Sequence, residues 1–127
     1  MTQEEKELLL KDLSARLPYG VKGIITYDES NTTFIVEGID NNVLHLSDVE
    51  ECYVEDFKPY LRPMSSMTEE EMEEYRGTLI ALPDEEYLIS NMRTIDWLNA
   101  HHFDYHDLIS KGLALEAPEG MYNLKEK

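Results

Sequence analysis

Apolar residues near the N-terminus recur at the spacing of a helix that is covered on one face. They are Leu9, Leu10, Leu13 and Leu17. Thr2 precedes the pattern and is followed three residues later by Glu5, which is the spacing of a capping box, and Pro18 ends the pattern. The pattern predicts a helix over about residues 3–16 whose leucine face packs on a core.

The hydrophobic period changes between residues 21 and 54. Three short runs rich in β-branched and aromatic residues, VKGIITY, TTFIVEGI and NVLHL, are separated by the turn-forming clusters DESN and DNN. They predict a meander of three antiparallel strands, with a fourth over residues 51–54. In the following FKPYLRP, Pro59 and Pro63 lack backbone donors, so we expect this segment to run extended over the surface and not as a central strand.

A second helix start follows in MSSMTEEEMEEYRG. Thr68 is placed as an N-cap with Glu71 at the third helical position, and Met67 and Met72 are spaced as a hydrophobic staple. Gly77 is where we expect the helix to end.

A further helix is predicted after Pro83, with Asp84 as its cap. Its apolar stripe consists of Leu88, Met92, Ile95 and Leu98. Thr94 is an alternative start for a separate short helix. With no internal repeat and no linker, these elements predict a single α+β domain over residues 1–127. We expect a small antiparallel meander of three to four strands, packed with an N-terminal helix and two to three C-terminal helices.

Three of the four histidines lie in the stretch HHFDYHD at residues 101–107. On one helix His102 and His106, four residues apart, would share a face, as in helical zinc sites. Zinc needs three or four ligands. The candidate ligands within the stretch are His101, His102, His106, Asp104 and Asp107, and folding could add His45 and Cys52.

The same letters also predict the start of a short helix. Asp104 is placed as an N-cap with Asp107 at the third helical position, and Phe103 and Leu108 are spaced as a staple. Gly112 can end the helix in a Schellman closure. The two interpretations compete, because a cap at Asp104 leaves one histidine of the pair before the helix. Helix initiation explains more residues and is the interpretation we favour.

The net charge is −16, from 27 acidic and 11 basic residues, whereas solubility needs only about 2 to 8 charges of one sign. Nucleic acids and anionic membranes repel such a chain, so a protein with a basic surface is the expected partner. Either the acidic residues form an interaction surface, even one that mimics nucleic acid, or they are a solvated surface. The candidate interaction residues are Asp48, Glu50, Glu51, Glu55, Asp56, Glu69, Glu70, Glu73 and Glu74.

Other sequence features argue for a cytoplasmic protein without catalytic machinery. No apolar run approaches the roughly 18 residues of a membrane span, and the N-terminus is acidic where a secretory signal would be basic. The single Cys52 forms no internal disulfide. Nucleophile elbows, Gly-rich phosphate loops and C-x-x-C pairs are missing from the sequence. We therefore expect no enzyme activity and no cofactor.

Three blocks of the chain resemble a family of small bacterial proteins associated with prophages and other mobile elements. The blocks are LPYGVK at 17–22, FKPYLRPMSSMT at 57–68 and HHFDYHDLISKGLALE at 101–116. The family pattern reads LPYGLK, KPILRPLSDLT and HFDYRGLIEKGLA in the same order. The resemblance implies a shared fold and carries no activity, substrate or site residue. Where this chain has His106 and Asp107 the family has Arg-Gly, so a metal site on His106 would not be a family property.

These observations lead to two functional hypotheses. The first is a non-enzymatic, acidic protein that acts through protein–protein contact as an accessory of a bacterial mobile element or prophage. The alternative is a metal-binding protein or metal-dependent hydrolase that uses the cluster at residues 101–107.

Overall fold

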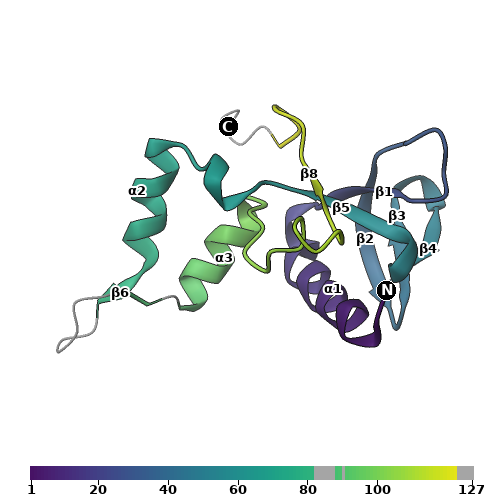
Figure 1. The fold of residues 1–127 in the computed structure, drawn as a ribbon, viewed down its shortest axis with the longest axis horizontal. Helices are drawn as coiled ribbons and strands as arrows, with labels where there is room; N and C mark the ends of the chain where they lie inside the picture. The colour runs from purple at the N-terminus through teal and green to yellow at the C-terminus, as the bar shows by residue number, and fades with distance from the viewer. Residues whose placement is uncertain (82–87, 90, 123–127) are drawn as a thin grey trace.

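The computed structural model describes residues 1–81, 88–89 and 91–122 and has an α+β fold (Figure 1). Helix α1 spans Gln3–Arg16, as the sequence predicts. Its capping box is complete: Thr2 N–H donates to the Glu5 carboxylate at 2.9 Å, and Glu5 N–H donates to the Thr2 hydroxyl at 3.0 Å. Leu9 and Leu13 are fully buried in the core, which confirms the inward face of the predicted stripe.

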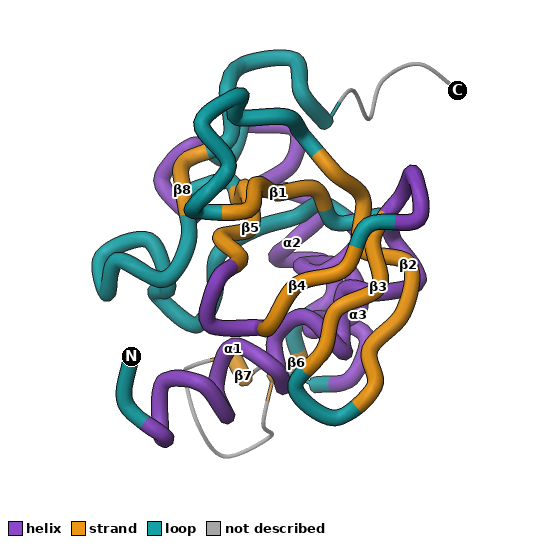
Figure 2. Tube along the Cα trace, turned by 90° about the vertical axis from the view of Figure 1, so that its right-hand side faces the viewer, coloured by secondary structure: helices purple, strands orange, loops and turns teal. Residues whose placement is uncertain are grey.

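The predicted four-strand meander is present. Its strands are β1 (Lys22–Ile25), β2 (Phe34–Asp40), β3 (Val43–Leu46) and β4 (Glu51–Tyr53). Each pairs antiparallel with the next, and they form one curved sheet (Figure 2). Alternate residues of β1, β3, β4 and the first half of β2 are buried in one core with the leucines of α1, and a register shift after Val36 ends the alternation in β2. The short 3-10 turns nearby are Leu17–Tyr19, Ser47–Val49 and Val54–Asp56.

The sheet is larger than the sequence predicts, because FKPYLRP contributes an inner strand and the prediction of a surface segment is wrong. Strand β5 (Phe57–Leu61) lies between β1 and β8 (Leu115–Glu116), in the order β4-β3-β2-β1-β5-β8. Thr26 N–H donates to Asp56 O, so the alternation of an antiparallel ladder places Pro59 at a non-hydrogen-bonded position toward β1. The parallel pairing with β8 begins only at Tyr60. Pro59 therefore costs the sheet no hydrogen bond.

Close approach of β5 to β1 requires glycine at position 23. Gly23 lies opposite Pro59. A Cβ atom built on Gly23 would collide with the Phe57 ring and lie 2.5 Å from the backbone oxygen of Lys58. Phe57 fills that space and is fully buried, so any side chain at position 23 would displace core and backbone together.

The C-terminal helices depart from the prediction at their ends. Helix α2 (Glu69–Thr78) begins with the predicted capping box of Thr68 and Glu71, but Gly77 lies inside its last turn and does not end it.

Helix α3 (Met92–Ala100) is capped by Asn91, whose N–H donates to the Thr94 hydroxyl. The prediction of a longer helix with an apolar stripe from Leu88 is therefore wrong. The predicted cap Asp84 lies outside the described residues. A small hairpin, β6 (Ile80–Ala81) and β7 (Leu88–Ile89), separates the helices; the 3-10 turn Met64–Ser66 precedes α2.

The elements are arranged along one long axis. Helices α2 and α3 lie at one end, and α1 with the strands of the meander lies at the other (Figure 1). Among the described residues no helix is both long and apolar enough to cross a membrane.

Candidate functional site

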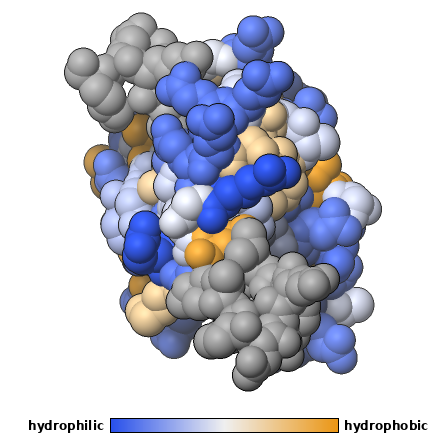
Figure 3. Space-filling model, turned by 90° about the vertical axis from the view of Figure 1, so that its left-hand side faces the viewer, coloured by the Kyte–Doolittle hydropathy of each residue, from blue (hydrophilic) through white to orange (hydrophobic). Residues whose placement is uncertain are grey.

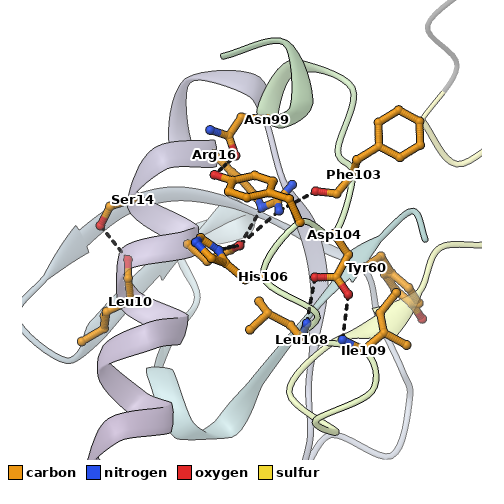
Figure 4. Close-up of polar contacts among 12 residues, drawn as sticks. Leu10, Ser14, Arg16, Tyr60, Asn99, Phe103, Asp104, His106, Leu108 and Ile109 are labelled. Atoms are coloured by element: carbon orange, nitrogen blue, oxygen red, sulfur yellow. Dashed lines mark hydrogen bonds and ion pairs between the residues drawn. The ribbon is translucent and has the colours of Figure 1, made fainter. Parts of the chain in front are cut away.

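Residues 101–116, which hold the histidine cluster, form successive turns and the strand β8, so the predicted short helix is wrong. The carboxylate of Asp104 is buried and accepts hydrogen bonds from Leu108 N–H at 2.8 Å and Ile109 N–H at 2.9 Å (Figure 4). Asp107 has a φ of 59°, which breaks a right-handed helical run. Asp104 therefore binds backbone amides, but it closes a loop and does not begin the predicted helix.

The predicted closure at Gly112 is present without the helix. Gly112 has a φ of 75°. Leu113 N–H donates to Leu108 O at 2.9 Å, and Gly112 N–H donates to Ile109 O at 3.1 Å, which are the two bonds of a Schellman motif.

The three histidines of the cluster have separate partners. His101 stacks on the Trp97 ring with centroids 4.0 Å apart, and its Nδ1 lies 2.9 Å from Trp97 O. His102 is buried and stacks on Tyr122, with centroids 3.6 Å apart. His106 Nδ1 lies 2.7 Å from an oxygen of Asp12 on α1. Within residues 1–81, 88–89 and 91–122, no three His, Cys, Asp or Glu side chains gather as a metal site would require.

A buried charge cluster on α1 is the feature that sequence reasoning missed. Asp12 and Arg16 are both fully buried. Arg16 Nε donates to Asp12 at 2.6 Å, and Arg16 Nη2 donates to Asp12 at 3.1 Å and to Phe103 O at 2.6 Å (Figure 4). Tyr105 covers the guanidinium, whose carbon is 5.1 Å from the ring centroid. The cluster fastens the loop of residues 103–106 to α1.

Hydrogen bonds and charge keep the carboxylate of Asp12 ionised. Burial acts to raise the pKa of Asp12, but the hydrogen bonds from His106 and Arg16 outweigh it, and the pKa of Asp12 lies below its usual value. An Asp–His pair can orient a general base. Among the described residues, no side-chain hydroxyl or thiol hydrogen-bonds to His106, whose bonded partner is Asp12.

The sequence did carry a signal for this cluster. Asp12 and Arg16 follow Leu9 by three and seven residues, so they occupy the same stripe as Leu9 and Leu13. Two charged residues at core positions of an amphipathic helix indicate a buried ion pair.

His102 is held by its surroundings in the neutral form. Burial is the main cause, and the positive charge of Arg16 is the next, so the pKa of His102 falls to about 3. Its stacking partner Tyr122 is fixed by Lys22 N–H, which donates to the phenol oxygen at 2.8 Å, and by a bond from the phenol to Tyr60 O at 2.8 Å. His102 therefore belongs to the packing between the loop, the sheet and the C-terminal segment.

The acidic candidates of the meander lie in one stretch of sequence that carries no basic residue other than His45. Residues 23–57 contain no lysine or arginine and nine carboxylates. Seven of these are exposed: Glu29, Glu37, Asp40, Asp48, Glu50, Glu51 and Glu55; Asp28 and Asp56 are half-buried. Only the 3.8 Å contact of Lys6 with Glu55 brings a cation from elsewhere in the described chain to this set. We call it the meander surface.

Apolar side chains are exposed in the same region. Val49 is 98% exposed, Tyr27 66% and Tyr53 60%. Val49 also has a φ of 61°, a conformation in which a β-branched residue is rare.

The acidic candidates of α2 lie at the opposite end of the long axis, so the two acidic groups do not share a face (Figure 1). That end is predominantly hydrophilic where its residues are described (Figure 3). Part of the α2 run is structural: Glu71 binds the Arg62 guanidinium through both oxygens at 2.7 and 2.8 Å, and Glu74 accepts from Trp97 Nε1 at 3.2 Å.

Comparison of the chain with protein-family models, curated proteins and solved structures finds no match.

Proposed function

We propose that this protein is a non-enzymatic interaction protein whose meander surface binds a protein with a basic surface. The observation that carries the proposal is the run of 35 residues, 23–57, with nine carboxylates and no lysine or arginine. None of the nine is fully buried.

Physical reasons favour a protein partner over mere solvation. Carboxylates of one sign repel one another, and intramolecular cations normally intersperse to relieve that cost. Exposed Val49, Tyr27 and Tyr53 in the same region add apolar and aromatic area, which supplies much of the affinity in protein interfaces. A basic partner would neutralise the carboxylates and cover these side chains.

The arrangement of the acidic groups limits which of them could mimic a nucleic acid. Because α2 and the meander lie at opposite ends, a mimic of a phosphate backbone would have to use the meander surface alone. The resemblance to small prophage proteins supports a role in a bacterial mobile element. The partner would then be a protein of the host or of the element.

Affinity capture from a bacterial lysate, followed by binding measurements with the purified captured protein, tests the proposal. Glu50→Gln/Glu51→Gln changes the meander surface by two charges, and Glu70→Gln/Glu73→Gln makes the same change on α2. We expect the meander variant to bind the partner at least about tenfold more weakly at physiological salt and the α2 variant to bind like the wild type. Equal binding by both variants, or no partner even at low salt, would contradict the proposal.

A further inference from the structure

Two exposed tyrosines flank a small hollow beside the edge strand β4. The hollow has a volume of about 230 Å³ and is lined by Tyr27, Val43, Glu51, Cys52 and Tyr53. Tyr27 comes from the turn after β1, and Thr26 N–H bonds to Asp56 O just beyond β4. This bond continues the pairing of β1 with β5, and the turn that follows β1 carries Tyr27 to the hollow that β4 also lines.

One side of the backbone of β4, which contributes Glu51, Cys52 and Tyr53 to the hollow, is open. Leu46 N–H donates to Glu50 O, and Val54 N–H donates to Asn42 O, both at 2.8 Å. In an antiparallel ladder of this register, the N–H and C=O groups of Glu51 and Tyr53 point away from β3. The described residues place no strand on that side, because β4 ends the sheet.

The chemistry around the hollow favours a cation. Tyrosine rings attract a cation through their faces, and a carboxylate beside them adds an ion pair. Glu51 supplies that carboxylate from the wall of the hollow. It lies 3.0 Å from His45 Nδ1, but the Glu51 side chain is still 60% exposed and can turn to a ligand. Burial, and after it the negative charge of Asp56, raises the pKa of the Cys52 thiol to about 11, so the anionic field reaches this residue of the wall.

We propose that this hollow receives a lysine or arginine side chain from an extended basic segment of the partner protein, which lies along the open edge of β4. The inference rests on the proposed function and names the place and chemistry of contact. The cation would sit between Tyr27 and Tyr53 and pair with Glu51. Backbone groups of the segment would bond to Glu51 and Tyr53, as in strand addition.

Charge decides between this occupant and a second copy of the chain. Two copies joined at β4 would bring two meander surfaces together, each with nine carboxylates and no lysine or arginine in its own sequence. That contact is repulsive. A basic extended segment gains from the same field.

The test uses a nine-residue peptide of alternating lysine and threonine, with a glutamine–threonine peptide as control. Binding to the full chain is followed by isothermal calorimetry and by amide chemical shifts at 50 and 150 mM salt. We expect the lysine peptide to bind, with shifts concentrated at Tyr27 and residues 51–53, and the glutamine peptide not to bind. Tyr27→Ala/Tyr53→Ala should weaken binding by roughly tenfold, since each exposed cation–π contact is worth about 0.5–1 kcal/mol, or about two- to fivefold.

Matched variants distinguish binding in the hollow from non-specific attraction between the lysine peptide and an acidic protein. Tyr27→Phe/Tyr53→Phe keeps both rings and should retain most of the affinity, whereas Tyr19→Ala removes a 39% exposed tyrosine outside the hollow and should change nothing. Glu51→Gln should weaken binding more than Glu70→Gln, which makes the same change in net charge on α2.

Each contrary result has a definite meaning. If wild type and Tyr27→Ala/Tyr53→Ala bind the lysine peptide equally, the hollow is not the cation site, and the proposed function is unaffected. Self-association through β4, seen as a dimer by sedimentation and as shifts at residues 51–53 without peptide, overturns the choice of occupant. No binding of the lysine peptide at 50 mM salt overturns the inference, and only failure of the partner experiment above overturns the proposed function.

Discussion

Acidification between pH 7.5 and 5 should destabilise the protein through His102. The side chain is 4% exposed, and its pKa is about 3 in the folded state against 6.5 for an ordinary histidine. Below pH 6.5 the unfolded chain binds a proton that the folded chain does not, so the free energy of unfolding falls as the pH falls. These two values give a loss of about 2 kcal/mol at pH 5 relative to pH 7.5, and the loss continues down to about pH 3.

Urea unfolding followed by circular dichroism at pH 7.5 and 5 measures this loss. His102→Asn is the informative variant, because asparagine does not titrate and tolerates the φ of 64° at this position. The difference between the pH dependences of wild type and variant isolates His102, whatever the variant's absolute stability. His45→Gln removes a half-exposed histidine and should keep the loss due to His102. A His102→Asn protein that loses as much stability as the wild type would refute the burial argument.

Three further predictions concern the core. Gly23→Ala should lower the free energy of unfolding by about 2–3 kcal/mol through overpacking, whereas Gly77→Ala, with open space around it in α2, should raise it by up to about 1 kcal/mol; thermal melts that rank these two variants the other way would contradict the packing. Asp12→Leu and Arg16→Met should each cost about 3–5 kcal/mol by orphaning a buried charge, and the double variant should cost clearly less than their sum; additive losses in a double-mutant cycle would argue against the buried pair. Cys52, whose pKa is raised to about 11, should react with a disulfide reagent at pH 8 about a hundredfold more slowly in the folded than in the unfolded chain, and equal rates would show that the thiol is not protected.

Local signals predicted much of the fold. The capping boxes of α1 and α2 and the meander follow from residues within a few positions of one another, since caps and strand periodicity are local properties. The prediction from Pro59 that this segment is not an inner strand was wrong for a non-local reason. Whether a proline disrupts a sheet depends on which way its nitrogen faces and on where the neighbouring strand begins, and neither is encoded in the segment itself.

In the candidate site, too, local features were predicted and contacts between distant residues were not. The sequence predicted a short helix with Asp104 as its cap and Gly112 as its end; Asp104 does accept backbone hydrogen bonds and Gly112 does close a Schellman turn, but the helix between them is absent. The separate partners of the three histidines could not be predicted, because Trp97, Tyr122 and Asp12 reach them from α3, the C-terminal segment and α1.

The sequence by itself determined the charge of this protein, its capped helices and its meander, because composition and short-range periodicity fix them. Only the tertiary structure decided that the two acidic groups lie at opposite ends, that β5 is an inner strand, and that Tyr27 and Tyr53 line one hollow beside β4. These features depend on contacts between residues far apart in the chain, and such contacts form only when the core closes.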